Sequence, residues 1–389
     1  MSFFDKWLLE KRDSLQARGM WREIPDLDHG ADLVVSLNGH KVINLASNNY
    51  LGLAGTREMK DAAVQAVAAY GTSSGASRLV TGTFGLYSQL ESALAELKNQ
   101  EACLVFGSGY AANMGLITGL AGRRSVVFSD RLNHASIVDG IILSRARHVR
   151  YRHNDMDHLA YCLKNHRDVS EKFLITDSVF SMDGDRADLC ALVALCREYD
   201  VVMAVDEAHA TGILGQGRGL ACELGLEREI HLHMGTLSKG LGSHGGFVCA
   251  RQDVVDLLKN LARSFIFSTA LPASVIGAGL CGVQWVQDHP HAGEKLLELS
   301  AGLREFLVSL GFAVGPSSTQ IIPVIMGDNA TTLWARDHLL ASGVLVSAIR
   351  PPTVPQGTSR LRLALRADMQ AEHFAKVRMA FVRLQEAMA

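Results

Sequence analysis

The sequence predicts an α/β protein: a large domain built on a mostly parallel sheet, followed by a small α+β domain. Between Met59 and Ile266, helix-like stretches alternate with short apolar runs, as in strands joined by helical crossovers. The runs are apolar on successive residues, which is typical of strands covered on both faces. The chain has 389 residues, 48% of them hydrophobic, enough for a large core and more than one domain. The expected divisions are an N-terminal helix and β arm (1–56), a large domain (57–285) and a C-terminal domain (286–389).

The N-terminal arm begins with apolar residues at helical spacing within residues 2–18. Two short β segments, 33–36 and 41–45, flank Asn38-Gly39, a dipeptide that favours a hairpin turn. In the large domain, helices are expected at 58–70, 85–98, 110–120, 155–165 and 188–198. Strands are expected there at 102–106, 125–128, 173–176, 201–205, 231–234 and 247–250.

A helical region is expected from Pro272 to about residue 310. Residues 265–286 carry no charge and approach the length of a membrane span. Polar residues, one proline and several glycines interrupt them, which favours a buried helix starting near Pro272 and no membrane association. The C-terminal domain then has expected strands at 319–326, 345–348 and 360–364, and helices at 330–341 and 368–388.

Charge and cysteine content exclude several function classes. The formal net charge of −2 provides no basic field for nucleic acid. Seven cysteines, an odd number without any Cys-x-x-Cys, indicate reduced, buried thiols in a cytoplasmic protein. They also argue against a metal site.

Lys239 and Asp206 carry the strongest chemical signal. Lys239 is flanked by small and hydroxyl residues, about thirty positions after Asp206, which ends an expected strand. This pattern is typical of pyridoxal 5'-phosphate binding, where the lysine amine forms a Schiff base and the acid pairs with the pyridine nitrogen. Alternatively, Asp206 would be a helix cap or the partner of an arginine. His209, three residues on, would reach the Schiff base or the phenolic oxygen.

The phosphate of such a cofactor needs free amides and hydroxyls. Ser108, Gly109 and Tyr110 follow an expected strand and open a helix, where the N-terminal amides favour an anion. A Gly-Ser-Gly turn alone is more often only a turn. Thr236 and Ser238, which flank the lysine, would complete the cradle.

Two further loops follow expected strands. His134 offers a flat imidazole that would stack on the pyridine ring, although a solvated loop histidine is an equal alternative on this residue alone. Ser181 would hydrogen-bond the phenolic oxygen. The letters Asp206-Glu207-Ala208-His209 also spell an RNA helicase motif, but the chain lacks the phosphate loop that this motif requires upstream.

The motifs taken together resemble the α-oxoamine synthases, a branch of the fold type I pyridoxal-phosphate enzymes with a seven-stranded type of sheet. The segments that carry the resemblance are 47–52, 77–83, 133–136, 180–185, 206–212 and 236–240. The resemblance implies a homodimer in which Ser268 and Thr269 reach the phosphate of the neighbouring subunit. It also implies that Lys239 removes a substrate proton, that His134 assists acyl transfer and that Arg362 binds the amino-acid carboxylate.

Residues 348–358 look like the substrate segment of the branch that acylates L-alanine with a pimeloyl thioester in biotin synthesis. The resemblance implies that Arg22, Asn48 and Thr353 contact substrate. The acyl group would arrive on coenzyme A or on an acyl carrier protein. A carrier would need a basic patch, for which Arg145, Arg147, Arg150 and Arg152 are candidates, although such a run is more often a solvated strand edge.

Other activities share some of these residues. Within the family, the alternatives are 2-amino-3-ketobutyrate ligase, 5-aminolevulinate synthase and serine palmitoyltransferase. A pyridoxal-phosphate aldolase or lyase would share Lys239 and Asp206 but use no thioester. A non-catalytic scaffold is disfavoured by the presence of Lys239, Asp206 and His209 together.

Overall fold

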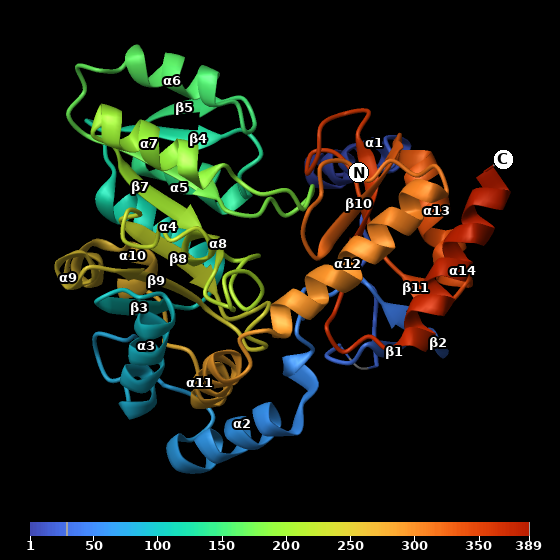
Figure 1. The fold of residues 1–389 in the computed structure, drawn as a ribbon, viewed down its shortest axis with the longest axis horizontal. Helices are drawn as coiled ribbons and strands as arrows, with labels where there is room; N and C mark the ends of the chain where they lie inside the picture. The colour runs from blue at the N-terminus through green and yellow to red at the C-terminus, as the bar shows by residue number, and fades with distance from the viewer. Residues whose placement is uncertain (29, 389) are drawn as a thin grey trace. The chain divides into compact units, whose positions relative to one another are not determined.

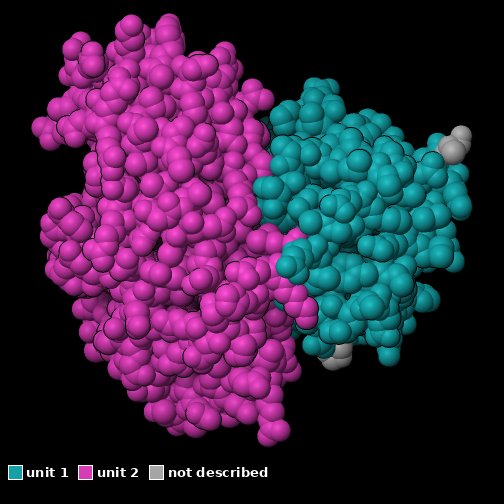
Figure 2. Space-filling model, in the orientation of Figure 1, with its two compact units in different colours: residues 1–47, 182–184, 298–389 teal, residues 48–181, 185–297 magenta. Residues whose placement is uncertain are grey.

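The computed structural model describes residues 1–28 and 30–388, and its contacts divide the chain into two compact units (Figure 2). Unit 1 contains residues 1–47, 182–184 and 298–389. Unit 2 contains residues 48–181 and 185–297. The N-terminal segment is therefore grouped with the C-terminal residues. The domain boundaries expected after residues 56 and 285 stay predictions.

Unit 2 is built on a seven-stranded sheet with the strand order β3-β9-β8-β7-β6-β4-β5 (Figure 1). β9 runs antiparallel to both of its neighbours, and the other four adjacent pairings, from β8 to β5, are parallel. The predicted fold class is confirmed. The strands are β3 (Ala102–Phe106), β4 (Val126–Asp130), β5 (Arg147–Tyr151), β6 (Lys172–Asp177), β7 (Val202–Asp206), β8 (Leu232–Thr236) and β9 (Gly246–Ala250).

Helices cover this sheet, and every residue of β4, β8 and β9 is buried. This burial is why the sequence shows continuous apolar runs rather than alternation. Helix α4 packs against α5, α9 and β9, and α11 packs against α2 and α3. The helices are α2 (Arg57–Tyr70), α3 (Gly85–Leu97), α4 (Gly109–Leu120), α5 (Ala135–Ser144), α6 (Met156–Lys164), α7 (Leu189–Tyr199), α8 (Leu220–Glu223), α9 (Gln252–Leu261), α10 (Arg263–Ile266) and α11 (Ala273–Asp288), with a 3-10 turn at Leu53–Gly55.

Unit 1 contains two three-stranded sheets, β1-β2-β11 and β10-β13-β12. The first joins the N-terminal hairpin to a short C-terminal strand through the parallel pair β11 and β2. The elements are α1 (Phe3–Ala17), β1 (Val34–Leu37), β2 (His40–Asn44), β10 (Ile321–Gly327), α13 (Asn329–Ala341), β11 (Val344–Leu345), β12 (Ser347–Ile349), β13 (Ser359–Ala364) and α14 (Ala371–Met388).

The expected helix from Pro272 to residue 310 is two helices, α11 and α12 (Ala292–Ser309). The interruption contains Pro290, which lacks the amide hydrogen of a helix interior and restricts the backbone of His289. The expected strand at 345–348 is likewise divided between β11 and β12. Helices α5 and α9 were not predicted. The arginine-rich segment near residue 147 is the edge strand β5, as its charge pattern favoured.

No helix in the described part of the chain combines the length and hydropathy needed to cross a bilayer. Within residues 1–28 and 30–388, no group of three His, Cys, Asp or Glu side chains is arranged to hold a metal ion. All seven cysteines are free. The expectation that they are buried is wrong for Cys190, which is exposed on α7.

Candidate active site

The sheet of unit 2 brings the predicted cofactor segments to one edge. β4, β6, β7 and β8 are parallel, and β3 runs in the same direction because both β3 and β8 are antiparallel to β9. The carboxyl ends of parallel strands meet at one edge of a sheet, where ligands bind in open α/β folds. His134, Ser181, Asp206, Lys239 and Ser108 all follow or end these strands.

Lys239 heads a chain of polar contacts. Its Nζ lies 3.0 Å from His209 Nε2, and His209 Nδ1 lies 2.6 Å from the Tyr50 hydroxyl. The Tyr50 hydroxyl in turn donates to Asn48 Oδ1 at 3.2 Å. If Tyr50 gives its only proton to Asn48, then His209 Nδ1 must donate to Tyr50, which leaves Nε2 as an acceptor facing the lysine amine. Sequence reasoning named Lys239, His209 and Asn48 but missed Tyr50, which is fully buried.

Asp206 ends β7 and is 4% exposed. Its Oδ2 accepts a hydrogen bond from Asn113 Nδ2 at 2.8 Å, and its Oδ1 accepts from the Ala208 amide at 2.9 Å. Asn113 lies on α4 and was not predicted as a site residue. A buried carboxylate held by neutral donors remains suited to a cationic ligand such as a protonated pyridine nitrogen.

Asp177 stands beside Asp206 on the neighbouring strand, in register with it. Burial, and next the charge of Asp206, raise the pKa of the Asp177 carboxyl well above its usual range. Asp177 Oδ2 accepts the His134 amide at 2.7 Å. Asp177 therefore fixes the loop that carries His134, a role that no sequence motif indicated.

His134 caps α5 and is linked to Asp206 through two side chains. Its Nδ1 lies 2.8 Å from Ser136 Oγ, and Ser136 Oγ accepts from Asn113 Nδ2 at 2.9 Å. His134 is exposed, but desolvation by surrounding protein atoms lowers its pKa; the charge of Asp206 opposes this shift and that of Lys239 adds to it. A neutral, accessible ring is what stacking on a protonated pyridine requires.

The turn at Gly109 is tightly packed against β8. A Cβ added to Gly109 would lie 3.2 Å from Met234 Cε and 3.4 Å from Thr236 Cβ. Ser108 caps α4, and its Oγ accepts the Ala111 amide at 3.0 Å. The N-terminal amides of α4 thus lie beside Thr236, close to the lysine segment. This is the geometry of a phosphate cradle.

The remaining cofactor candidates surround this turn. Thr236 Oγ1 accepts the Ser238 amide at 3.1 Å, and Ser238 is exposed. The Tyr110 hydroxyl is held by Asp139, which raises the pKa of Tyr110. The combination of a lysine amine, a buried acid, hydroxyls and helix amides fits pyridoxal phosphate. The roles of these residues stay predictions.

Ser181, Ser268 and Thr269 occupy other positions. Ser181 is partly exposed and follows Phe180 in the segment after β6. Ser268 and Thr269 line a small cavity that also contains Gly107, immediately before the phosphate turn. Their predicted contact with a neighbouring subunit stays a prediction.

The other predicted substrate residues belong to unit 1. Arg22 Nη2 lies 3.4 Å from Thr353 Oγ1, and Arg22 lines a cavity of about 980 Å³. Arg362, on β13, is 5% exposed and is therefore no surface charge. Arg360, two residues earlier and thus on the same face of the strand, forms an ion pair with Asp183. The approach of Arg22, Thr353 and Arg362 to substrate stays a prediction.

Comparisons with known proteins show the family of this chain. The family model of aminotransferase class I and II matches residues 40–381. The 8-amino-7-oxononanoate synthase of Geobacter metallireducens is 48% identical over 374 residues, covering 95% of this chain and 96% of that protein. The protein of that name from Geobacter sulfurreducens is 49% identical, with 95% of each chain covered.

Among the solved structures, the higher TM-score belongs to a protein with a different name. A serine palmitoyltransferase of Sphingomonas wittichii superposes with a TM-score of 0.93 at 30% identity, covering 100% of this chain and 99% of that chain. An 8-amino-7-oxononanoate synthase from Francisella tularensis superposes with a TM-score of 0.75 at 24% identity, over 89% of this chain and 98% of that chain, which shows a shared fold. Backbone shape therefore does not separate the activities within this fold.

Proposed function

We propose the substrates of this chain and the roles of its residues from its family. The chain belongs to the aminotransferase class I and II family and, within it, to the 8-amino-7-oxononanoate synthases. It is a pyridoxal-phosphate-dependent acyltransferase of biotin biosynthesis. The substrates are L-alanine and a pimeloyl thioester, and the products are 8-amino-7-oxononanoate, carbon dioxide and a free thiol. We further propose a homodimer in the cytoplasm.

One observation carries the choice of substrate: identity of 48% over 95% of the chain to a protein of this name. Serine palmitoyltransferase is the second candidate because of the TM-score of 0.93, but its identity is only 30%. The geometry of unit 2 supports the reaction type that both enzymes would share.

The cofactor site combines residues from five strand ends. Asp206 would bind the pyridine nitrogen, and Ser181 and His209 the phenolic oxygen. The amides from Ser108 to Tyr110, with the hydroxyls of Thr236 and Ser238, would hold the phosphate, and Ser268 and Thr269 would reach the phosphate of the partner subunit. When bound, pyridoxal phosphate supplies an electron sink that stabilises negative charge at the alanine Cα.

Lys239 is the proposed base. Its amine is half-buried, and it donates toward the neutral Nε2 of His209 in the arrangement described above. Once released from the cofactor, the neutral amine removes the Cα proton of alanine and later returns a proton to the product carbon. Because Tyr50 and Asn48 fix the ring of His209, the acceptor atom stays aimed at the lysine.

The remaining roles concern the two substrates. His134 would cover one face of the ring and donate to the thioester carbonyl as Cα attacks it and the thiol leaves. Arg362 would bind the alanine carboxylate as a fork until it is lost as carbon dioxide. Arg22, Asn48 and Thr353 would contact the acyl substrate, on coenzyme A or on a carrier protein.

The test is product analysis with a panel of substrates. Purified holoenzyme is given L-alanine, glycine or L-serine with pimeloyl, acetyl, succinyl or palmitoyl thioesters, and thiol and carbon dioxide are measured. We expect the highest kcat/KM for L-alanine with a pimeloyl thioester. A preference for L-serine with palmitoyl thioester would select the second candidate, and turnover of an amino acid without thiol release would indicate an aldolase or lyase.

A further inference from the structure

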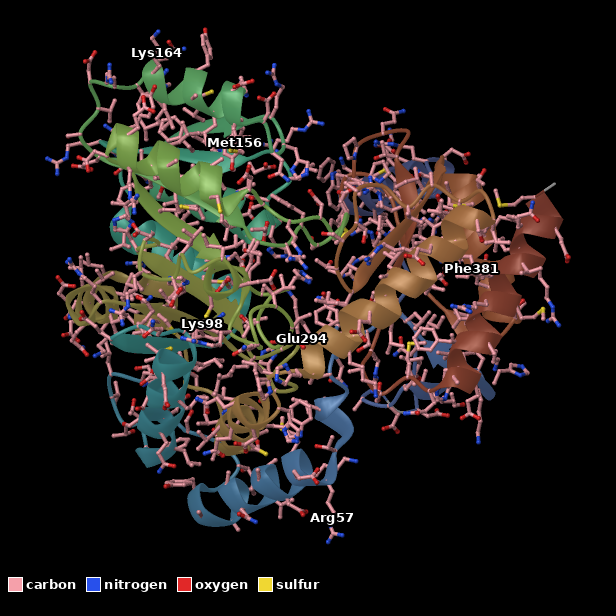
Figure 3. All side chains as sticks on the ribbon, in the orientation of Figure 1. Arg57, Lys98, Met156, Lys164, Glu294 and Phe381 are labelled. Carbon is pink, nitrogen blue, oxygen red and sulfur yellow. The ribbon has the colours of Figure 1, made fainter. Side chains whose placement is uncertain are left out.

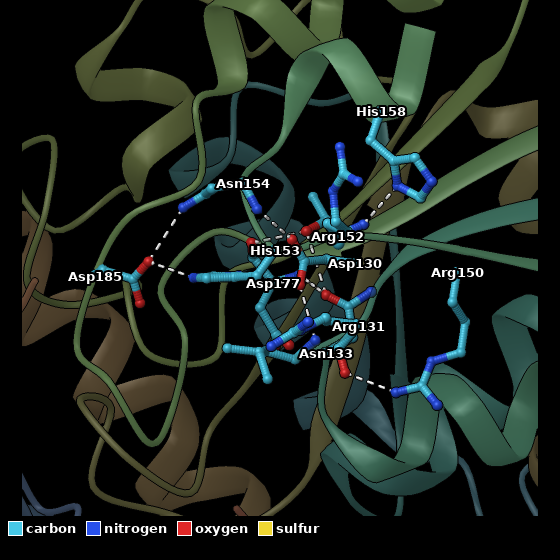
Figure 4. Close-up of polar contacts among 12 residues, drawn as sticks. Asp130, Arg131, Asn133, Arg150, Arg152, His153, Asn154, His158, Asp177 and Asp185 are labelled. Atoms are coloured by element: carbon cyan, nitrogen blue, oxygen red, sulfur yellow. Dashed lines mark hydrogen bonds and ion pairs between the residues drawn. The ribbon is translucent and has the colours of Figure 1, made fainter. Parts of the chain in front are cut away.

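His153, just beyond β5, joins two site loops that come from different strands. Its Nδ1 lies 3.0 Å from Asp130 Oδ1, and its Nε2 lies 2.8 Å from Asp185 Oδ2 (Figure 4). Asp130 ends β4, four residues before His134. Asp185 comes four residues after Ser181. One imidazole therefore spans the loops that carry two of the proposed site residues.

The number of protons in this bridge is restricted by its chemistry. A neutral imidazole has a single N–H, so it can donate to one carboxylate but not to two. Both contacts are satisfied when His153 is an imidazolium. Burial alone would lower the pKa of His153, but the hydrogen bonds and charges of Asp130 and Asp185 outweigh it and raise that pKa to about 9.

Both acids are fixed further by the loops themselves. Asp130 is fully buried and accepts the Leu132 amide at 2.8 Å and the Asn154 amide at 2.9 Å. Asn154 Nδ2 also lies 3.1 Å from Asp185 Oδ2. The bridge thus contacts the backbone two residues before His134.

The second loop is held by an aromatic contact as well. The ring of Phe180 meets the ring of His153 at 4.4 Å between centroids and at 90°. Phe180 is 1% exposed, and its amide donates to the Asp185 carbonyl at 3.0 Å. Ser181 is the next residue, so a shift of the imidazole moves its backbone.

Other charged and titratable groups surround the bridge. Arg152 forms an ion pair with Asp155, and Arg186 forms one with Glu223. His158 Nδ1 accepts the Arg152 amide. The pKa values of Tyr151 and Asp177 are raised mainly by burial, with a contribution from the charge of Asp130. Since both arginines are paired with other acids, His153 is the cation placed between Asp130 and Asp185.

We propose that His153 is a positioning residue, whose imidazolium bridge to Asp130 and Asp185 holds the loops of His134 and Ser181 in the geometry that the reaction needs. This inference rests on the proposed function, because it assigns the two loops to the acyl-transfer site. His153 itself touches neither substrate nor cofactor. Its removal should lower kcat more than it raises KM.

The first experiment compares His153→Phe with a matched control. Phenylalanine keeps a flat ring beside Phe180 but removes both donors. His166→Phe is the control, because His166 also contacts an aromatic ring, Phe128, but its Nδ1 faces the Cys162 carbonyl rather than an acid. We expect kcat for L-alanine and pimeloyl thioester to fall about 10- to 100-fold in His153→Phe, with KM for alanine changed less than about threefold. His166→Phe should keep the wild-type kcat.

A double variant tests the bridge even if His153→Phe fails to fold. In His153→Gln with Asp185→Asn, the glutamine amide donates to Asp130, and its oxygen accepts from the new asparagine. This neutral pair rebuilds both contacts without a titrating group. We expect kcat to recover to within about fivefold of wild type, whereas His153→Gln alone keeps the defect.

The pH profile separates positioning from a general loss of stability. The charged bridge is complete below the ordinary histidine pKa of 6.5 and is lost as pH rises through about 9. The kcat/KM of wild type should therefore fall relative to that of the double variant as pH approaches 9 and beyond. A constant ratio across this range, or wild-type kcat in folded His153→Phe, overturns the proposal. Absence of turnover in the wild type would instead refute the proposed function.

Discussion

Asp206 and Glu207 are adjacent acids with opposite environments. Asp206 ends β7, and its carboxylate accepts hydrogen bonds from an amide side chain and a backbone amide, both neutral donors, so it keeps the capacity to bind a cationic ligand. Glu207 is fully paired: Lys98 Nζ lies 2.8 Å from its Oε2, and the Ala221 amide lies 3.0 Å from its Oε1. One carboxylate is kept for a ligand and the other is used by the fold.

The Glu207 cluster is sealed from water. Lys98, labelled in Figure 3, also donates to Thr211 and to the Arg218 carbonyl. Burial would raise the pKa of Glu207, but the charges and hydrogen bonds of Lys98 and His233 outweigh it and lower that pKa to about 2. The difference between the two acids shows that neighbouring residues of one motif can have separate roles, one in the reaction and one in the stability of the fold. Substitutions on the Asp206 side should change rate, and substitutions on the Glu207 side should change the free energy of unfolding.

The largest effect on rate is expected from Lys239→Ala. Removal of the amine eliminates both the attachment point of the cofactor and the proposed base, so turnover should fall by more than about 10³-fold. The far-ultraviolet circular dichroism and the unfolding midpoint should stay close to wild type, because Lys239 is not part of the core. Lys259→Ala is the control, because Lys259 is a partly exposed lysine paired with Asp256, and it should keep full activity. Steady-state activity in Lys239→Ala would refute the assigned role.

The largest effect on stability is expected from Lys98→Met. This change leaves Glu207 charged, buried and without its cation, at a cost of about 3–5 kcal/mol in the free energy of unfolding. Urea unfolding measures the effect. Lys172→Met is a matched control, since Lys172 is also buried but its Nζ donates to the Val169 carbonyl. Lys98→Met with Glu207→Leu should recover much of the loss, and an equal loss in the control would contradict the assignment.

The sequence predicted the residues of the site around Asp206, but it did not predict the buried cluster around Glu207. Lys239, Asp206 and His209 are found from the sequence because the chemistry needs particular residue types at strand ends, and strands leave an apolar signal. Lys98 gives no such signal, because its partner lies more than a hundred residues away and is set by tertiary packing. His153 and Tyr50 were missed for the same reason.

The fold shows the same division. The alternation of apolar runs and helices predicted six of the seven strands of the large sheet. The seventh, the charged edge strand β5, was predicted only as the alternative to a basic patch for a carrier protein. Helix boundaries were wrong where a local interruption decided them, as at Pro290. Local pattern thus predicts elements, while side-chain contacts across the sheet depend on topology.

A smaller rate effect is expected from Asp206→Asn. The neutral amide cannot stabilise a protonated pyridine nitrogen, so kcat should fall about 10²- to 10³-fold, a loss comparable to removing one key electrostatic group at an active site. Glu207→Gln is the matched neighbour, and it should reduce stability while the folded enzyme keeps most of its kcat. Steady-state kinetics and urea unfolding on both variants measure the contrast. If the two variants lose rate and stability in the same proportion, the division between the adjacent acids is wrong.

The smallest effect on rate is expected from Tyr50→Phe. This variant tests whether the residues that affect the rate include Tyr50. Loss of the hydroxyl removes the partner of His209 Nδ1, so the ring no longer holds its Nε2 acceptor toward Lys239, and kcat/KM should fall about five- to tenfold. Tyr87→Phe is a matched control, because Tyr87 is equally buried and its hydroxyl donates to the Leu271 carbonyl. Each variant should lose about 1 kcal/mol of stability from one buried hydrogen bond. Because the two stability losses are expected to be equal, a rate loss confined to Tyr50→Phe measures the contribution of the Tyr50–His209–Lys239 chain. Equal rates in the two variants would show that Tyr50 does not belong to the site.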